Sequence, residues 1–506
     1  MTDRAPLPIV IAGGGTAGWM AAAVFARFLG RHAQITLVES DAIGTVGVGE
    51  ATIPQIHNLL VGLGLDQAEF VRRTNATFKL GIEFDGWQQA GHAYLHSFGQ
   101  VGRGIGLIPF RQLWLRGRAL GVAGDYGDYS VNVAAARGRR FAIGGGEKGG
   151  ALPDLAYAYH FDALLFAGLL RDYAEARGVK RVEGIIAAVE RNGATGDIAA
   201  LRLDGERRVE GGLFIDCTGF RSLLLGEALG VPFTDWTRYL PCDAALAVPC
   251  ASVPELTPYT RSTARPAGWQ WRIPLQHRMG NGYVFCSAFT SVDEAAALLL
   301  ANLDGAALGE PRPIRFTTGH RAQFWSHNCV ALGLAAGFME PLESTSIHLV
   351  QSGIGRLLDV LSGDLADNGT ARDAFNRLSA IEWARVRDFL VLHYVANERV
   401  GEPFWDHCRA MDLPPVLAEK IALFRQSGAF MREADELFLD DSWAQVMLGQ
   451  GITPRGWSPL ADDVTGAEIG PYLATLARAC RLKAEGLPAH RAFVDALVAP
   501  AVRKSA

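Results

Sequence analysis

The sequence predicts a mixed α/β (α+β) fold with a mostly helical C-terminal part. A short apolar strand at 8–12 runs through a glycine turn into a helix, and further apolar strands end on acidic or glycine residues within 211–222 and 330–344. After Gly369, apolar residues recur with helical spacing at Phe375, Leu378, Ile381, Phe389 and Leu390. Prolines 403, 414, 454 and 459 then divide the segment into short elements. A chain of 506 residues with 49% hydrophobic content can form two or three domains.

The N-terminal strand, turn and helix predict a dinucleotide site. Gly13, Gly15 and Gly18 fit the GxGxxG pattern, in which the glycines allow a tight turn, backbone approach to a pyrophosphate and close packing of helix on strand. A second predicted strand, 34–40, carries Glu39 at the position where a carboxylate binds a ribose hydroxyl. The alternative, a glycine-rich turn that binds nothing, would not require an acid at that place.

Two further segments carry single polar residues of interest. In "TFKLGIEF" apolar residues alternate on one face of a predicted strand and leave Lys79 on the other, where pattern alone favours a solvated lysine. In "AYHFDA" Asp162 is expected to cap a helix, and we assign no chemistry to His160.

The later strand ends indicate which dinucleotide binds. "GGLFIDCTGFRS" stops at Asp216, Thr218 and Gly219, and "VALGLAAGFMEPLES" supplies another strand and glycine turn. Three strand ends directed at one ligand, spread over the chain, resemble the flavin monooxygenase type of FAD domain, in which separated segments assemble one sheet. This resemblance implies an FAD-binding domain from 1–84, 156–224 and 316–368, a substrate domain from 85–155 and 225–315, and a helical C-terminal region, 369–506, that covers the substrate pocket.

Between these segments, "GWQWRIP" contains the pattern WxWxIP. Alternation along a strand places Trp269 and Trp271 on one face, where the two indoles can form a rigid aromatic wall. Taken alone, such a pair is more often part of a core.

The stretch "PLESTSIHLV" places Glu343 before Ser344, Thr345 and Ser346, where a helical apolar pattern begins. Either Ser344 or Thr345 can cap this helix, and its free backbone N–H groups are suited to a small anion. An ordinary capped helix with a solvated glutamate is the alternative.

Together, GxGxxG, "GVGEATIP", Lys79, WxWxIP and "PLEST", in this order, resemble the flavin-dependent tryptophan halogenase family, and "HSFG" and "AYHFDA" also resemble family segments. The resemblance implies that reduced FAD and oxygen oxidise chloride or bromide to hypohalous acid, which reaches a separate aromatic pocket. It implies that Lys79 and Glu343 are catalytic and that Thr345 and Ser346 hold the halide. The implied FAD-binding residues are Gly13, Gly15, Thr16, Ala17, Gly18, Glu39, Val48, Ala51, Ile185, Asp216, Gly219, Leu334 and Ile347. The implied substrate pocket contains His96, Phe98, Trp269, Trp271, Ser344, Glu433 and Phe438.

The chain departs from this family's pattern near its C-terminus. Enzymes acting on free tryptophan carry a Tyr-Tyr pair, a Glu and a Phe-Trp pair that hold the charged end of the amino acid. Here Gln426 and Ser427 stand at the place of the tyrosines, with Glu433 and Leu437–Phe438 downstream. We therefore expect indole or an indole derivative rather than free tryptophan as substrate.

The composition limits partners and location. A net charge of −5 without blocks of like charge makes nucleic acid an unexpected partner, and seven scattered cysteines indicate a reduced, cytoplasmic compartment. We expect no membrane span and no metal site. A separate NAD(P)H-dependent flavin reductase is expected to supply FADH2. We expect the chain itself to be a monomer or homodimer. An FAD-dependent aromatic hydroxylase and a non-catalytic flavin-binding protein remain as alternatives.

Overall fold

The chain passes back and forth between two structural units, each assembled from three separated segments. The computed structural model describes residues 5–43, 49–144, 152–362, 368–433 and 436–499. Unit 1 contains Met1–Asn75, Phe161–Thr237 and Phe316–Ala384, and unit 2 contains Ala76–His160, Arg238–Arg315 and Arg385–Ala506. In this division into compact units, the C-terminal helices after Ala384 belong to unit 2. The expected division of the chain by function, into an FAD-binding domain, a substrate domain and a C-terminal covering region, stays a prediction.

A six-stranded sheet forms the centre of unit 1. Its order is β20 (Trp325–Ser326), β21 (Cys329–Ala331), β12 (Leu213–Asp216), β1 (Leu7–Ala12), β2 (Ala33–Glu39) and β8 (Lys180–Glu183). All neighbours are parallel except β20 and β21, so the predicted strand ends lie at one edge. In register, Asp216 lies opposite both Ala12 and Ala331. The sheet thus aligns strand ends that are far apart in the sequence.

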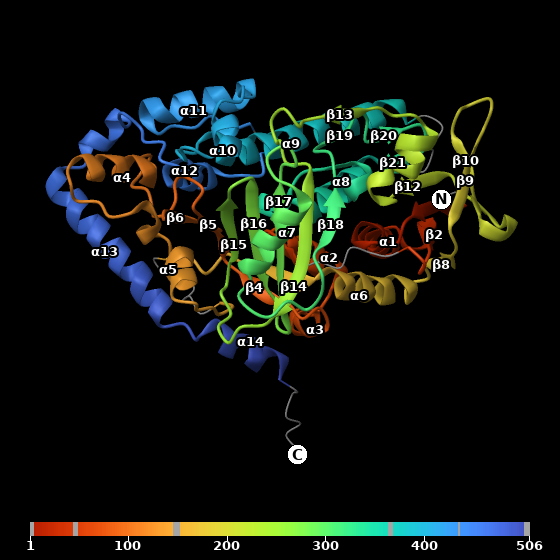
Figure 1. The fold of residues 1–506 in the computed structure, drawn as a ribbon, viewed down its shortest axis with the longest axis horizontal. Helices are drawn as coiled ribbons and strands as arrows, with labels where there is room; N and C mark the ends of the chain where they lie inside the picture. Colours follow the sequence, from red (N-terminus) through yellow and green to blue (C-terminus); the bar gives the residue numbers. More distant parts are fainter. Residues whose placement is uncertain (1–4, 44–48, 145–151, 363–367, 434–435, 500–506) are drawn as a thin grey trace, which may run out of the picture. The chain divides into compact units, whose positions relative to one another are not determined.

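Helices cover this sheet. Helix α1 (Thr16–Phe28) packs against α6 (Ala163–Glu175), beside which it lies in Figure 1, and against α8 (Ser346–Val360). Its small residues Ala21, Ala22 and Ala23 are fully buried, which allows this close packing. Asp162 caps α6 by accepting hydrogen bonds from the N–H groups of Leu164 and Leu165, which confirms the predicted cap.

Unit 1 also contains smaller elements. These are β3 (Gly49–Ala51), α2 (Ile56–Leu63), α3 (Gln67–Arg73), β9 (Ile186–Arg191), β10 (Ile198–Leu203), β11 (Arg208–Glu210), β13 (Phe233–Asp235), β19 (Gly319–Arg321) and β22 (Gly337–Phe338).

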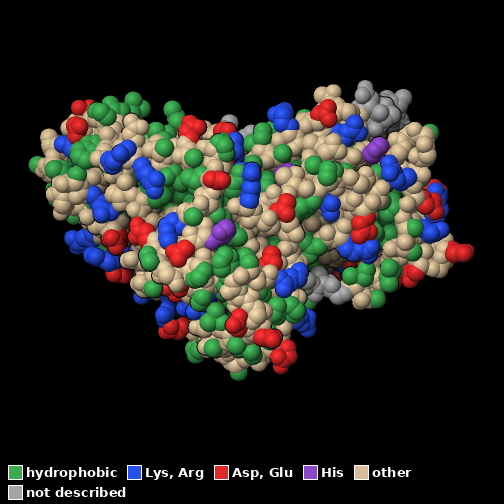
Figure 2. Space-filling view, turned by 45° about the horizontal axis from the view of Figure 1, so that its top comes forward, with side chains coloured by type: hydrophobic (Ala, Val, Ile, Leu, Met, Phe, Trp, Pro, Cys, Tyr) green, Lys and Arg blue, Asp and Glu red, His purple; other side chains and the backbone are tan. Residues whose placement is uncertain are grey.

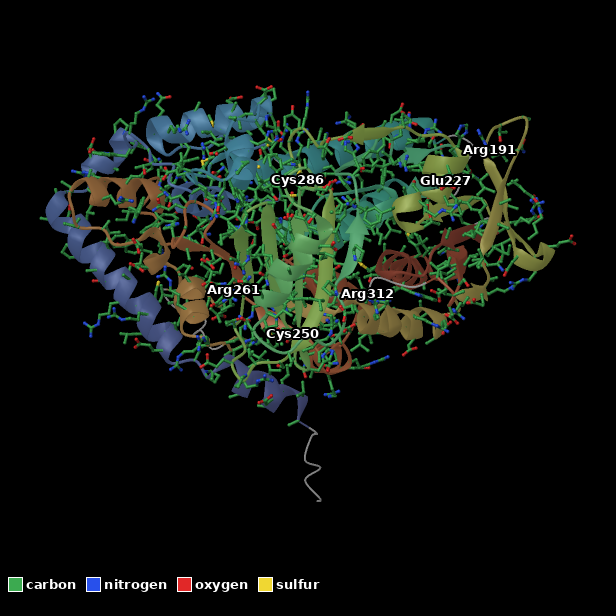
Figure 3. All side chains as sticks on the ribbon, in the orientation of Figure 1. Arg191, Glu227, Cys250, Arg261, Cys286 and Arg312 are labelled. Carbon is green, nitrogen blue, oxygen red and sulfur yellow. The ribbon has the colours of Figure 1, made fainter. Side chains whose placement is uncertain are left out.

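A seven-stranded sheet forms the core of unit 2. Its order is β18 (Arg312–Arg315), β14 (Ala244–Ala251), β17 (Arg278–Phe285), β16 (Gly268–Pro274), β15 (Thr260–Arg265), β5 (Gly81–Asp85) and β6 (Ala93–Ser97). Figure 3 labels Arg312 on β18 and Arg261 on β15, toward opposite sides of this sheet. Helix α7 (Val292–Ala301) packs Ala295 and Leu299 onto the sheet beside Tyr283.

Unit 2 is otherwise mostly helical. Its further elements are β4 (Thr77–Lys79), α4 (Phe110–Ala119), α5 (Val131–Arg137), α10 (Pro403–Arg409), α11 (Pro415–Ser427), α12 (Asp440–Gly449), α13 (Gly466–Glu485) and α14 (His490–Val498). Strand β7 (Ala158–Asp162) and helix α9 (Gly369–Val395) contribute residues to both units. On α9 the predicted stripe is only partly correct, because Phe375, Phe389 and Leu390 are buried but Ile381 is exposed.

The helices within the described residues differ in length and hydropathy from membrane-spanning helices. None of the helices in that part of the chain combines the length and apolar composition needed to cross a bilayer. On the face drawn in Figure 2, acidic and basic side chains are interspersed.

Candidate active site

The glycine turn after β1 has the geometry of a pyrophosphate site. Gly13 has a φ of +104°, and a Cβ at this position would lie 2.3 Å from the carbonyl oxygen of Cys217. A Cβ at Gly18 would lie 1.9 Å from the carbonyl oxygen of Gly13, so both positions require glycine for packing. At Gly15, by contrast, no described atom lies within 4 Å of an added Cβ. This open space adjoins Thr16 and Ala17 at the N-terminus of α1, where a phosphate fits.

Glu39 lies directly over this turn. A Cβ on Gly14 would overlap the Oε2 atom of Glu39, and the Oε1 atom accepts a 2.6 Å hydrogen bond from Nε of Arg181. That hydrogen bond raises the pKa of Arg181. The carboxylate at the end of β2 is therefore held next to the glycine turn, which is the arrangement expected of a residue that binds a ribose.

Three of the other predicted FAD-binding residues, Ile185, Gly219 and Leu334, follow strands of the same sheet. Ile185 follows β8 and is half exposed, and Gly219 has a φ of +73° just beyond β12. Leu334 lies in the turn Gly333–Ala335 that follows β21. This turn packs against α1, since a Cβ on Gly333 would lie 2.9 Å from Cβ of Ala17. Ala51 and Ile347 are buried elsewhere in unit 1, and Val48 lies outside the described residues.

Asp216 shapes this edge of the sheet. Its Oδ1 atom accepts hydrogen bonds from the N–H and hydroxyl of Thr218, at 3.0 and 2.6 Å. Its Oδ2 atom accepts from the N–H groups of Leu224 and Leu225, at 2.9 and 2.8 Å. Because both oxygens already have protein partners, this side chain holds the turn that carries Gly219.

The "PLEST" segment forms a 3₁₀ turn followed by α8. Glu343 ends the turn and is 1% exposed, so the alternative of a solvated glutamate is wrong. Ser344 adopts the left-handed conformation, with a φ of +58°. Thr345 is the N-cap of α8, but its side chain makes no capping hydrogen bond because its backbone is already helical, with φ −92° and ψ −8°. The helix thus begins at Ser346 without a hydroxyl cap from Thr345, which suits an external anion.

A partly buried polar network links α8 to α9. Glu382 on α9 contacts Nε2 of His348 at 3.1 Å and accepts hydrogen bonds from Ser352 at 2.9 Å and Arg356 at 3.0 Å. Burial raises the pKa of Glu382, but His348 and Arg356 outweigh this effect and lower it overall. Glu382 could not be identified from the sequence, because its partners lie on another helix.

Lys79 lies in unit 2 and is fully buried. Its Nζ atom is 5.2 Å from the centre of the Phe98 ring. The predicted single strand is interrupted at Leu80, whose N–H donates to Pro258 O at 2.7 Å and whose carbonyl accepts from Phe98 N at 2.8 Å. The interpretation from strand pattern alone, a solvated lysine, is therefore wrong, because both faces of β4 are covered.

An aromatic cluster lies in the same unit. The His96 ring lies 5.5 Å from that of Phe389 and 6.3 Å from that of Phe438, and these two phenyl rings stack at 3.7 Å. Sequence reasoning placed Phe389 only in a buried helical stripe, because its contact with Phe438 is tertiary. Trp269 and Trp271 lie on one face of β16, as predicted, with ring centres 6.1 Å apart.

Glu433 is bound by a neighbouring helix. Arg385 donates two hydrogen bonds to its carboxylate, from Nε at 2.6 Å and Nη2 at 2.7 Å, and these lower the pKa of Glu433. Of the predicted substrate residues, Ser344 belongs to unit 1 and the others belong to unit 2. Within the described ranges, no group of three His, Cys, Asp or Glu side chains has the geometry of a metal site.

The glycine turn after β1, with the carboxylate of Glu39 beside it, is typical of a dinucleotide-binding oxidoreductase. More specifically, the chain belongs to the tryptophan halogenase family, whose model matches residues 8–466. It is 37% identical over 448 residues to tryptophan 6-halogenase SttH of Streptomyces toxytricini, covering 83% of this chain and 84% of that protein.

Solved structures agree with this assignment. Xcc4156, a flavin-dependent halogenase from Xanthomonas campestris, is 48% identical with a TM-score of 0.94, and the match covers 98% of this chain and 99% of that one. BrvH, a flavin-dependent halogenase from Brevundimonas sp. BAL3, is 44% identical with a TM-score of 0.93, covering 97% and 98%. Membership of this family supports FADH2-dependent halogenation, with FAD and a halide as reactants.

Proposed function

We propose that the enzyme halogenates indole, or an indole derivative without a free amino-acid group, using chloride or bromide. Bound reduced FAD and oxygen supply the oxidising equivalent that turns the halide into hypohalous acid. The turn at Gly15 and the carboxylate of Glu39 hold the dinucleotide. Asp216 contributes by fixing the turn at Gly219. The backbone at Thr345 and Ser346 holds the halide.

Lys79 and Glu343 carry the remaining chemistry in this proposal. The nitrogen of Lys79 either donates a hydrogen bond to hypohalous acid as its ammonium, or, as the free amine, takes the halogen from hypohalous acid to form a haloamine and releases water. Burial against Phe98 excludes water from this step. Glu343, also buried, stabilises positive charge on the ring and accepts the ring proton as aromaticity returns.

The observation that carries the substrate assignment is the Arg385–Glu433 ion pair. A carboxylate that already accepts two hydrogen bonds from a guanidinium is a poor partner for the ammonium group of an amino acid. The place of the missing tyrosines supports the same substrate class, because Gln426 is exposed and the carbonyl of Ser427 accepts a hydrogen bond from Gln112 at 3.0 Å. The stacked Phe389 and Phe438 rings beside His96 offer contacts to a neutral aromatic ring instead.

The test is a competition between two substrates. Purified enzyme receives FAD, oxygen, bromide, NADH and a separate flavin reductase, together with equal concentrations of indole and free tryptophan. We expect bromoindole as the main product by mass spectrometry. Faster bromination of tryptophan would overturn the substrate proposal, and hydroxyindole without bromoindole would indicate a hydroxylase.

A matched variant tests the ion pair. Glu433→Gln removes the charge but keeps the shape, so indole turnover should stay within about twofold if this half-exposed carboxylate does not touch the substrate.

Omitting the reductase from the same assay tests the expected partner. Rapid reduction of the bound flavin by NADH alone would contradict dependence on a second protein.

A further inference from the structure

A hydrogen bond from the C-terminal helix reaches the strand that carries Lys79. The backbone N–H of Phe78 donates to Nε2 of His490 at 3.1 Å, and both residues are buried. His490 is the first residue of α14, which lies beyond residues 8–466 matched by the family model. A distant segment therefore contacts the residue immediately before Lys79.

The partners of His490 define its tautomer. The carbonyl oxygen of Leu256, 3.1 Å from Nδ1, can only accept, and the N–H of Phe78 can only donate. A neutral imidazole with its proton on Nδ1 satisfies both partners at once. Burial lowers the pKa of His490 to about 4, and the nearby charge of Arg491 adds to this effect, so the ring is neutral at pH 7.

The backbone around Lys79 is fixed on both sides. Lys79 on β4 pairs with Ala158 on β7. Because N–H groups alternate in direction along a strand, those of its neighbours Phe78 and Leu80 point away from β7. Pro258 O accepts from Leu80 and His490 accepts from Phe78. Thr77 adds a third contact, because its hydroxyl donates to Pro274 O at 2.6 Å and contacts His160 Nδ1 at 3.1 Å.

Helix α14 is itself held to the rest of unit 2 by hydrogen bonds and aromatic contacts. The N–H of His490 donates to Arg139 O at 2.8 Å, and Phe141 N donates to Pro488 O at 3.1 Å. The Phe493 ring lies 5.5 Å from that of Phe78 and 5.2 Å from that of Phe141. The rings of Phe78 and Phe141 stack on each other, with their centres 4.2 Å apart. The helix thus provides both a hydrogen-bond acceptor and an aromatic contact for the residue beside Lys79.

We propose that His490 is a positioning residue for the ring-halogenation step, because its hydrogen bond to Phe78 fixes the strand that presents Lys79. This inference rests on the proposed role of Lys79. It assigns a function to a C-terminal helix outside the family-matched region.

Two variants of the full-length enzyme separate the two ring nitrogens. In His490→Gln the amide oxygen can replace Nε2 as acceptor for Phe78. In His490→Asn the shorter amide can replace Nδ1 as donor to Leu256 but leaves Phe78 without an acceptor. We expect His490→Asn to lower indole bromination about tenfold, equivalent to about 1.4 kcal/mol in the barrier. His490→Gln should stay within about threefold of the parent, and both should release hypobromous acid to a chemical trap at the parental rate.

Hydrogen exchange supplies a second readout without substrate or flavin. Peptides containing the Phe78 amide should exchange faster in His490→Asn than in the parent or in His490→Gln. Arg491 lies on the same helix as His490 and donates a 3.3 Å hydrogen bond to Val253 O in a distant loop. Arg491→Gln is therefore the control and should behave as the parent. Parental bromination by a folded His490→Asn enzyme, or equal losses in the Gln and Asn variants, would overturn the proposal.

Two further measurements keep the outcomes distinct. If His490→Asn does not fold, Thr77→Val takes its place, because it removes the hydroxyl that contacts Pro274 and His160 but keeps the side-chain shape. This variant should also lose indole bromination while it releases hypobromous acid at the parental rate. Parental bromination by Thr77→Val would count against the proposal. Lys79→Ala is assayed in parallel. If Lys79→Ala brominates indole normally, the proposed role of Lys79 fails; if only Lys79→Ala loses bromination, the inference about His490 fails.

Discussion

At the scale of single residues, Lys79 and Glu343 are both buried but belong to different units. We expect Lys79→Ala to lose ring halogenation while hypohalous acid still forms. Glu343→Gln keeps the shape but removes the charge, so turnover should fall about a hundredfold, which corresponds to roughly 3 kcal/mol of lost transition-state stabilisation. The measurements are halogenated indole by mass spectrometry and free hypohalous acid by a trap.

The trap is needed because only Ser344 separates Glu343 from Thr345 and Ser346, which are proposed to hold the halide. A loss of trapped hypohalous acid in Glu343→Gln would show that the substitution disturbs halide oxidation rather than the ring reaction. Parental halogenation of indole by Lys79→Ala would mean that free hypohalous acid is the reagent.

At the scale of secondary-structure elements, the unit formed by β1, the glycine turn and α1 allows a selective test. Gly15 has a φ of −70° and open space at its Cβ position, so Gly15→Val should fold normally but block the pyrophosphate. We expect its apo form to melt at the parental temperature and to lose FAD binding. FAD fluorescence titration and thermal unfolding measure the two effects.

Gly13→Ala is the contrasting variant. Its added Cβ would collide with the Cys217 carbonyl and its φ is positive, so both stability and FAD binding should fall. Retention of FAD by Gly15→Val at parental affinity would refute the assignment of this turn.

The same elements show what a sequence can predict. The β1–turn–α1 unit and the cap at Asp162 follow from short local patterns, and both were predicted correctly. The burial of Lys79 was not predicted from its strand pattern, because β4 is covered on both faces by distant segments. His490 and Arg385 also act through tertiary contacts, which leave no local signal in the sequence.

At the scale of the whole molecule, two buried histidines predict a dependence of stability on acid. Burial lowers the pKa of His490 to about 4, with a further contribution from Arg491. Burial, Lys79 and His490 lower the pKa of His160 well below its ordinary value. Both rings are neutral when folded but gain protons when unfolded below about pH 6.5, so the contribution of these two histidines to stability falls as the pH decreases through this value.

The contribution of His490 can be isolated between pH 7 and 5.5. Over this interval its preferential protonation in the unfolded chain should lower the free energy of unfolding by about 1.2 kcal/mol. Carboxylates with lowered pKa values, such as Glu382 and Glu433, lose their contribution only at lower pH. His490→Asn removes the titrating group, so its free energy of unfolding, measured with urea, should change less over this interval than that of the parent. An equal change in both proteins would show that His490 is not the group responsible.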